Sequence, residues 1–287
     1  MTTAERVTDA VVDHGECPFW DHSTQRLLWA DVLAGRVQVL TSSGATSHYD
    51  LPSQVATVVR RRESGGFVVA TEKALMGADE GFTEFEQLAQ LTNKAGVRTN
   101  DGTCDPLGGL AIGTMGYDES PGGGEVYRVS AEHHVATLVT PVTISNGVQW
   151  SADGNRVFYI DTPTRRVDVF RFDWETGAWH DRRVHIEIPK EAGFPDGMAI
   201  DEEDGLWIAM WGMAQVNHYD AIGRFVESIL VPGVSQVSSC AFGGERLEDL
   251  FITTSRLGIS PGSETEAGAL FAVRTGVRGT IARDFAG

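Results

Sequence analysis

The sequence predicts an all-β protein of the six-bladed β-propeller class, and three observations support this prediction. One pattern, consisting of a strand, a glycine-containing turn, an apolar strand, a loop and a third strand, occurs six times along the chain. The apolar middle strands recur at intervals of roughly 40–49 residues, which is the period of propeller blades rather than of helical repeats. The chain also contains 33 glycines, as expected where turns join many short strands. The middle strands are centred on Trp29, Val68, Ile112, Phe158, Trp207 and Phe251.

The first three repeats are rich in β-branched and aromatic residues, which favour strands. Their expected strands are 19–21, 26–31 and 35–40, then 55–60, 67–71 and 73–76, then 101–105, 110–114 and 124–129. The fourth repeat, 145–177, is the clearest of the six. Its turn at Asp153-Gly154 precedes strands 157–161 and 167–172, because Asp-Gly combines a side chain that caps its own backbone with a residue that tolerates positive φ. The last two repeats have expected strands 197–201, 206–209 and 216–219, then 238–242, 250–254 and 268–273.

The segments outside the repeats complete this picture. Residues 6–12 are expected to form a strand that completes the last blade and closes the ring, which removes a free sheet edge. Residues 82–91 have a weak helical pattern, and we expect a loop or an excursion on the outside of a blade. A β-sandwich is the alternative fold, but six copies of one pattern favour the propeller. No linker divides the chain, so we expect a single domain over residues 1–287.

Charge and composition exclude several function classes. The net charge of −17 argues against nucleic acid and against anionic membrane surfaces, since both need a basic patch. The N-terminus has no apolar signal-peptide core, and no segment approaches the ~18 apolar residues of a spanning helix. We therefore expect a cytoplasmic protein. The three cysteines, Cys17, Cys104 and Cys240, have no zinc-site spacing, so we expect reduced, structural thiols.

Polar residues precede the first strands of several repeats, where a propeller forms its central channel and binding mouth. Glu16, Asn146 and Asp196 occupy equivalent places in their repeats, so we expect them to face one axis. Two carboxylates and an amide are oxygen donors that suit a hard divalent cation such as Ca²⁺, Mg²⁺ or Mn²⁺, with Zn²⁺ or Fe²⁺ as alternatives. Taken singly, Asn-Gly and Asp-Gly are turn formers and a glutamate is usually solvated. Their equivalent positions favour a shared site.

The same mouth supplies candidate substrate contacts. Arg98 and Asn100 can hydrogen bond several hydroxyls or a carboxylate, although a surface arginine and an Asx turn are the simpler interpretation. Asp101 is a substrate ligand, a support for the metal site or a turn cap. Asp118 follows an apolar strand, so it is either a carboxylate that reaches the mouth or an ordinary loop carboxylate. Other chemistries lack their motifs: there is no HExxH or HxxxH, no Gly-x-Ser-x-Gly elbow and no P-loop.

Several ordered motifs resemble the SMP-30/gluconolactonase/LRE-like family over almost the whole chain. They include Gly15-Glu16-Cys17-Pro18-Phe19-Trp20, Arg98-Thr99-Asn100-Asp101-Gly102, Ser145-Asn146-Gly147-Val148, Pro195-Asp196-Gly197-Met198 and Cys240-Ala241-Phe242-Gly243-Gly244. The resemblance implies a six-bladed propeller. It also implies metal ligation by Glu16, Asn146 and Asp196, substrate contacts at Arg98, Asn100 and Asp118, and an acid/base role for Asp196. Three departures stand out: Cys17 replaces a usual glycine, residues 107–111 lack a usual Gly-Arg and aromatic, and Glu245 replaces a common proline.

The resemblance and the oxygen donors together predict metal-assisted hydrolysis of a sugar lactone such as gluconolactone. Calcium is the expected cofactor, with Zn, Mg, Mn or Fe as alternatives. Asp196 would accept a proton from the attacking water, while Arg98, Asn100 and Asp118 would orient sugar hydroxyls. Two alternatives are a metal-binding regulatory propeller without turnover and an aryl-ester or organophosphate hydrolase on the same scaffold.

Overall fold

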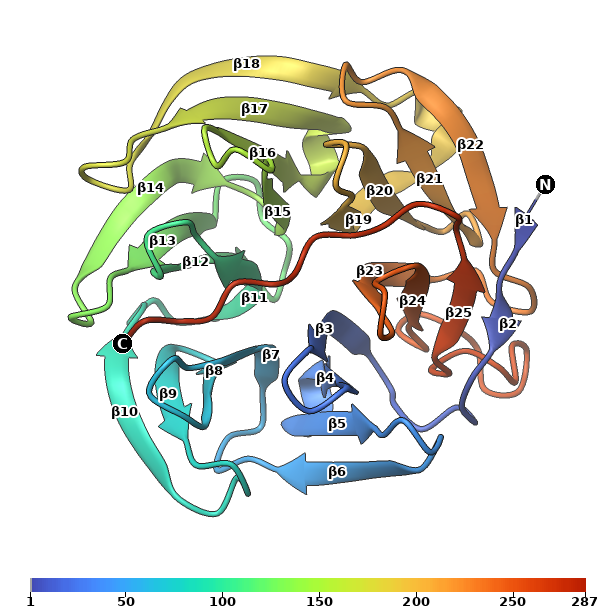
Figure 1. Ribbon diagram of the computed structural model, residues 1–287, viewed down its shortest axis with the longest axis horizontal. Coiled ribbons are helices and arrows are strands. Elements are labelled where there is room, and N and C mark those ends of the chain that lie inside the picture. Colours follow the sequence, from blue (N-terminus) through green and yellow to red (C-terminus); the bar gives the residue numbers. More distant parts are fainter. Residues whose placement is uncertain (1) are drawn as a thin grey trace.

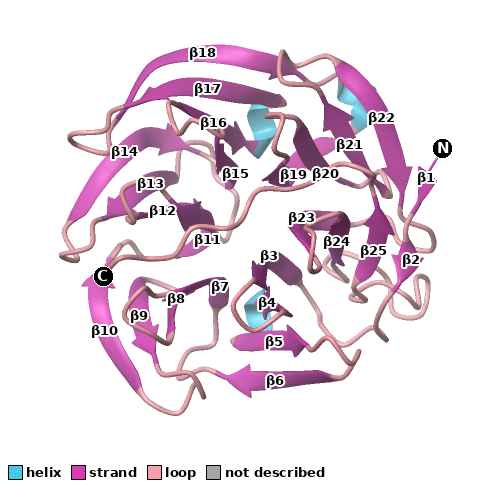
Figure 2. Ribbon diagram, in the orientation of Figure 1, coloured by secondary structure: helices cyan, strands magenta, loops and turns pink. Residues whose placement is uncertain are grey.

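Six sheets, each built on four antiparallel strands, surround a central axis in the computed structural model, which describes residues 2–287 (Figures 1 and 2). The first strand of each sheet lies next to the axis and the last lies at the rim (Figure 1). The predicted six-bladed propeller is thereby confirmed. Blade 1 contains β3 (Gly15–Asp21), β4 (Arg26–Asp31), β5 (Arg36–Leu40) and β6 (Thr46–Asp50). Blade 2 contains β7 (Ala56–Arg61), β8 (Phe67–Thr71), β9 (Ala74–Ala78) and β10 (Phe85–Gln90). Blade 3 contains β11 (Val97–Cys104), β12 (Leu110–Gly116), β13 (Gly124–Val129) and β14 (Val135–Val142).

The second half of the ring repeats this order. Blade 4 contains β15 (Ser145–Trp150), β16 (Arg156–Asp161), β17 (Arg166–Phe172) and β18 (Trp179–Glu187). Blade 5 contains β19 (Phe194–Ile200), β20 (Leu206–Trp211), β21 (Gln215–Tyr219) and β22 (Phe225–Leu230). Blade 6 contains β23 (Val237–Gly243), β24 (Asp249–Thr254) and β25 (Phe271–Arg274). Three short 3₁₀ helices, η1 (Val32–Ala34), η2 (Thr162–Thr164) and η3 (Lys190–Ala192), lie between strands. No helix within residues 2–287 has the length and apolar character needed to cross a membrane.

The N-terminal segment closes the ring, as predicted, but with earlier residues than 6–12. β2 (Glu5–Arg6) pairs with β25 as the outermost strand of blade 6, and β1 (Thr2–Thr3) adds a fifth strand to blade 5. The weak helical pattern of residues 82–91 was misleading, because 85–90 form β10, the outer strand of blade 2. A rim strand has one solvated face, so its apolar residues can be sparse enough to imitate helical spacing.

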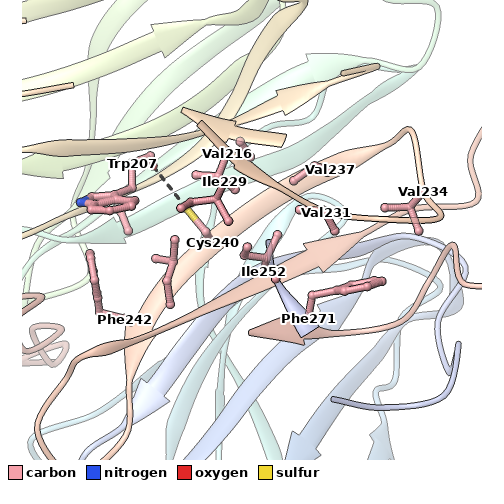
Figure 3. Close-up of a cluster of buried hydrophobic side chains, with 14 of the residues drawn as sticks. Trp207, Val216, Ile229, Val231, Val234, Val237, Cys240, Phe242, Ile252 and Phe271 are labelled. Carbon is pink, nitrogen blue, oxygen red and sulfur yellow. Dashed lines mark hydrogen bonds between the residues drawn. The ribbon is translucent and has the colours of Figure 1, made fainter. Parts of the chain in front are cut away.

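The apolar core is divided among the spaces between neighbouring blades. Between blades 5 and 6, the buried side chains include Trp207, Val216, Ile229, Cys240 and Phe271 (Figure 3). The Cys240 thiol donates to the Trp207 carbonyl at 3.2 Å, and burial raises the pKa of this thiol to about 12. All three cysteines are free and buried, which confirms the expectation of structural thiols.

The C-terminal segment seals one end of the central channel. Residues 280–283 line a cavity of about 60 Å³ together with Cys104 and Phe242, which lie toward the ends of inner strands. Phe285 is completely buried against blades 2 and 3, and Figure 1 shows this segment crossing the middle of the ring. The channel is therefore open to a ligand from the other end, where the inner strands begin.

Candidate functional site

A register irregularity in every inner strand shapes the open end of the channel. The pairing of each innermost strand with its neighbour shifts within the first few residues, as in β3 after Glu16, β15 after Asn146 and β19 after Pro195. The same shift occurs in β7, β11 and β23. A bulge bends a strand and redirects its side chains. Glu16 and Asn146 are the last paired residues before their bulges, and Asp196 lies within its bulge, so all three stand where an inner strand bends.

The glycines that follow Asn146 and Asp196 belong to these bulges and not to turns. A Cβ on Gly197 would lie 2.1 Å from Ser239 Oγ, and one on Gly147 would lie 2.8 Å from Met198 Cγ. Glycine is required because the inner strands of neighbouring blades approach each other closely here. The turn interpretation of Asn-Gly and Asp-Gly is therefore wrong for both pairs.

The bulges place the predicted residues around one cavity of about 260 Å³. Its polar lining comprises His14, Glu16, Arg98, Asn100, Glu119, Asn146, Thr162 and Asp196. Its apolar lining comprises Met115, Ile144, Pro163, Phe194, Trp211 and Leu257. The structure thus brings together all three expected metal ligands and two of the three expected substrate contacts.

Two of the acidic residues in this cavity, Glu16 and Asp196, hold their protons tightly. Burial raises the pKa of Glu16 to about 8, and the nearby Asp101 adds to the rise. Burial also raises the pKa of Asp196 well above its usual value, and the negative charges of Glu16 and, to a smaller extent, Asp101 raise it further. Two buried carboxylates side by side cannot both ionise at neutral pH unless a cation compensates their charge.

The donor set fits a divalent cation. Asp196 Oδ1 is buried and has no hydrogen-bond partner within residues 2–287, although such atoms in folded proteins are nearly always satisfied. Glu16, Asn146 and Asp196 would supply two carboxylates and one amide oxygen, as hard cations prefer. Among the described residues, no three His, Cys, Asp or Glu side chains form a cluster that could hold a metal. A cation beside Glu16 and Asp196 would therefore need further oxygen ligands, and the Asn146 amide lines the same cavity.

Arg98 and Asn100 contact each other and the candidate ligand Asn146. Arg98 Nη1 donates to Asn100 Oδ1 at 2.6 Å, and Asn100 Nδ2 donates to Asn146 Oδ1 at 3.0 Å. A second bond from Asn100 Nδ2 reaches the Ser145 carbonyl at 2.9 Å. Both side chains are more than nine-tenths buried. Asn100 is therefore committed mainly to protein contacts, while the remaining guanidinium N–H groups of Arg98 stay free of protein partners in the described chain.

This arrangement can be compared with known proteins. A family model for the SMP-30/gluconolactonase/LRE-like region matches residues 14–256. The chain belongs to this family. The resemblance predicted from the motifs is thus confirmed.

Members of the SMP-30/gluconolactonase/LRE-like family resemble the chain along nearly its full length. It is 32% identical to regucalcin from Homo sapiens, with 95% of each chain covered. The structure of a luciferin-regenerating enzyme is 27% identical, with a TM-score of 0.93 and full coverage of both chains. A structure described as the calcium-binding protein regucalcin, from Agrobacterium tumefaciens, is 26% identical, with a TM-score of 0.94 and coverage of 99% of this chain and 97% of the other.

Two predicted acidic residues do not line the cavity. The Asp118 carboxylate accepts a hydrogen bond from the Ser120 N–H at 3.1 Å, which holds it in its own turn and lowers its pKa. Glu119, the next residue, lines the cavity instead. Asp101 lies deeper in the channel, where Oδ1 accepts from the Gly102 N–H at 2.6 Å and from the Cys17 thiol at 3.0 Å. Of the three roles predicted for Asp101, its position fits a support for the metal site, because its charge acts on Glu16 and Asp196 from below the cavity.

The replacement of the family's usual glycine by Cys17 is accommodated within the first bulge. Cys17 has a φ of 47°, a left-handed conformation that normally favours glycine. Its buried thiol contacts Asp101, and burial raises the thiol pKa. Cys17 is thus a structural group beneath the cavity and not a nucleophile.

Sequence reasoning missed His14, Thr162, Glu119 and the apolar lining of the cavity. His14 Nδ1 lies 2.9 Å from Ser255 Oγ, and Nε2 lies 3.9 Å from Glu16 Oε1. Burial, followed by the charge of Arg98, lowers the pKa of His14 to about 3, so this ring is neutral. His14 precedes an inner strand, and its position two residues before Glu16 was a usable signal. Thr162 follows a second strand, so a search restricted to inner strands could not find it.

Proposed function

We propose that the chain is a divalent-cation-dependent hydrolase that opens sugar lactones such as gluconolactone. The observation that carries this proposal is the unpartnered, buried Oδ1 of Asp196 beside Glu16 and Asn146. Membership of a family named for gluconolactonase supports the reaction class. Calcium is the expected ion, because every donor is oxygen and a relative is described as calcium-binding.

The residues of the cavity would divide the chemistry between them. Glu16, Asn146 and Asp196 would hold the cation, which when bound supplies Lewis acidity toward the lactone carbonyl and lowers the pKa of water. Asp196 would accept a proton from the attacking water and return it to the ring oxygen as the C–O bond breaks. The product is then the open hydroxy acid, with water added across the ester bond.

Arg98 would orient the substrate through the guanidinium N–H groups that its protein contacts leave free. These groups can donate to sugar hydroxyls and fix the lactone in a reactive position. The contribution of Asn100 would be smaller, since both of its polar atoms already bind protein partners. Glu119 is a better placed acidic contact than Asp118, because Glu119 lines the cavity.

The test is lactone hydrolysis by the wild type and by Asp196→Asn, measured above the spontaneous rate with saturating Ca²⁺. We expect hydrolysis by the wild type and a loss of at least 100-fold in the variant, since general acid–base catalysis contributes about 10²–10⁴-fold. Asp181→Asn, in an exposed ion pair with Arg171 on the rim, is the matched control. Full activity of Asp196→Asn would contradict the proposed role.

Two alternative functions have specific support. A regulatory cation-binding propeller without turnover is consistent with the regucalcin relatives; bound Ca²⁺ with no hydrolysis across a lactone panel would identify it. The apolar wall that includes Phe194, Trp211 and Leu257 favours an aryl-ester hydrolase. Competition between gluconolactone and an aryl ester would test this second alternative, because the two turnover rates in a mixture give the ratio of the kcat/KM values.

A further inference from the structure

We propose that Thr162 is a positioning residue that fixes the side-chain amide of Asn146 with its oxygen available to a cation. Thr162 is the first residue of η2, directly after β16. Its side chain bridges Asn146 on blade 4 and the Pro195 carbonyl on blade 5. The inference rests on the proposed function in one respect, namely that Asn146 is a cation ligand.

A chain of four hydrogen bonds connects these groups. Arg98 Nη1 donates to Asn100 Oδ1 at 2.6 Å, and Asn100 Nδ2 donates to Asn146 Oδ1 at 3.0 Å. Asn146 Nδ2 then donates to Thr162 Oγ1 at 2.8 Å, and Thr162 Oγ1 donates to the Pro195 carbonyl at 2.8 Å. This series of hydrogen bonds crosses blades 3, 4 and 5 and ends on the residue before Asp196.

The two end groups of this hydrogen-bond series, Arg98 and the Pro195 carbonyl, fix which atom donates and which accepts in every bond between them. A guanidinium can only donate, and a proline carbonyl can only accept. Every group between them must therefore accept from the Arg98 side and donate toward Pro195. If the Asn146 amide rotated by half a turn, its Nδ2 would face the N–H₂ of Asn100, and the Thr162 hydroxyl could satisfy only one of Asn146 Oδ1 and the Pro195 carbonyl.

Burial makes this direction costly to reverse. The exposed fractions of Arg98, Asn100, Asn146 and Thr162 are 5%, 7%, 3% and 9%, so water has little access to compensate a lost bond. A buried donor or acceptor that loses its partner is destabilising, because its hydrogen bonds to water are not recovered. The hydroxyl of Thr162 thus keeps the amide nitrogen away from the position where a cation requires an oxygen.

Removing the hydroxyl should weaken cation binding. Loss of an outer-shell partner of a metal ligand typically costs about 10–100-fold in metal affinity. We expect this loss for Thr162→Val, which keeps the shape of the side chain, and less than about threefold for Thr162→Ser, which keeps the hydroxyl. Thr164→Val is the matched control, because Thr164 lies in the same 3₁₀ helix and donates to the Asp161 carbonyl at 2.7 Å outside the chain of bonds.

The experiment measures Ca²⁺ affinity by calorimetry for each variant, with thermal unfolding to confirm folding. It repeats Thr162→Val in an Asn146→Asp background, where both side-chain oxygens accept and there is no amide to orient. We expect the cost of Thr162→Val to disappear in that background. An equal cost in both backgrounds, or failure of Thr162→Ser to restore affinity, would overturn the proposal.

A second readout does not depend on a cation. In the ¹⁵N-labelled, calcium-free protein, the Asn146 side-chain N–H₂ signals should show a proton protected from exchange, and Thr162→Val should abolish the protection while Thr164→Val should not. Unchanged protection in Thr162→Val would overturn the positioning role. If the wild type binds no divalent cation but the protection behaves as expected, the proposed function fails while the positioning of Asn146 stands.

Discussion

The substitution Glu16→Gln should stabilise the cation-free protein at neutral pH while removing its cation affinity. In the folded chain, burial and Asp101 raise the pKa of Glu16 from 4.5 to about 8. The folded state therefore holds a proton that the unfolded state releases above pH 4.5. The free energy of unfolding should consequently fall as pH rises between these two values, and remain unaffected by Glu16 below them.

The size of the effect follows from the pKa difference. Each pH unit above 4.5 costs the folded wild type about 1.4 kcal/mol, so the cost at pH 7 is on the order of 3 kcal/mol. Glutamine has the shape of the protonated acid and needs no proton. For a chain of this size we expect Glu16→Gln to raise the melting temperature by about 6 °C at pH 7, with little change near pH 4.5.

The assay is thermal unfolding in chelator between pH 4.5 and 8, with Glu175→Gln, an exposed position, as the matched control. Added Ca²⁺ should stabilise the wild type and leave Glu16→Gln unchanged, because only a protein that binds the ion gains stability from it. A Glu16→Gln variant that is less stable than the wild type at pH 7 in chelator would refute the reasoning.

Three further predictions concern the same cavity. Calcium affinity of the wild type should rise with pH up to about 8, because the pKa of Glu16 is about 8 and the pKa of Asp196 is also raised. The rise should be up to about tenfold per pH unit for each proton that calcium displaces. Calorimetry at pH 6, 7 and 8 would show a constant affinity if these carboxyls were not ligands. Arg98→Lys should raise KM for gluconolactone about tenfold or more with a smaller effect on kcat, because lysine cannot reproduce the guanidinium fork; an unchanged KM would argue against substrate contact. Asn146→Asp should bind Ca²⁺ more tightly yet turn over more slowly, since a third carboxylate lowers the Lewis acidity of the ion; faster turnover at equal occupancy would contradict this.

The blades could be predicted from sequence because their strands follow a local rule. A period-two pattern and glycine turns are written into each repeat separately, and six copies reinforce one another. The exceptions lie at the rim. β10 has a weak pattern because one face is solvated, and the division of the N-terminus between blades 5 and 6 depends on pairing partners more than 200 residues away.

The candidate site was predictable only where it follows the repeat. Glu16, Asn146 and Asp196 occupy equivalent places, and the structure brings them to one cavity. The direction of the Asp118 side chain was not predictable, because a hydrogen bond within its own turn sets it. Thr162 could not be found from its strand position, because its role comes from a contact between two blades. Glycine after Asn146 and Asp196, within apolar strands, was a usable sign of bulges.

The measurement that tests the central claim most directly is the rate of gluconolactone opening by protein stripped of divalent cations, before and after Ca²⁺ is returned. We predict a rate equal to the spontaneous one in the stripped protein, restored catalysis on addition of Ca²⁺, and no restoration in Asp196→Asn. Full activity after complete removal of divalent ions would contradict the account, and so would a calcium-loaded protein that leaves the spontaneous rate unchanged.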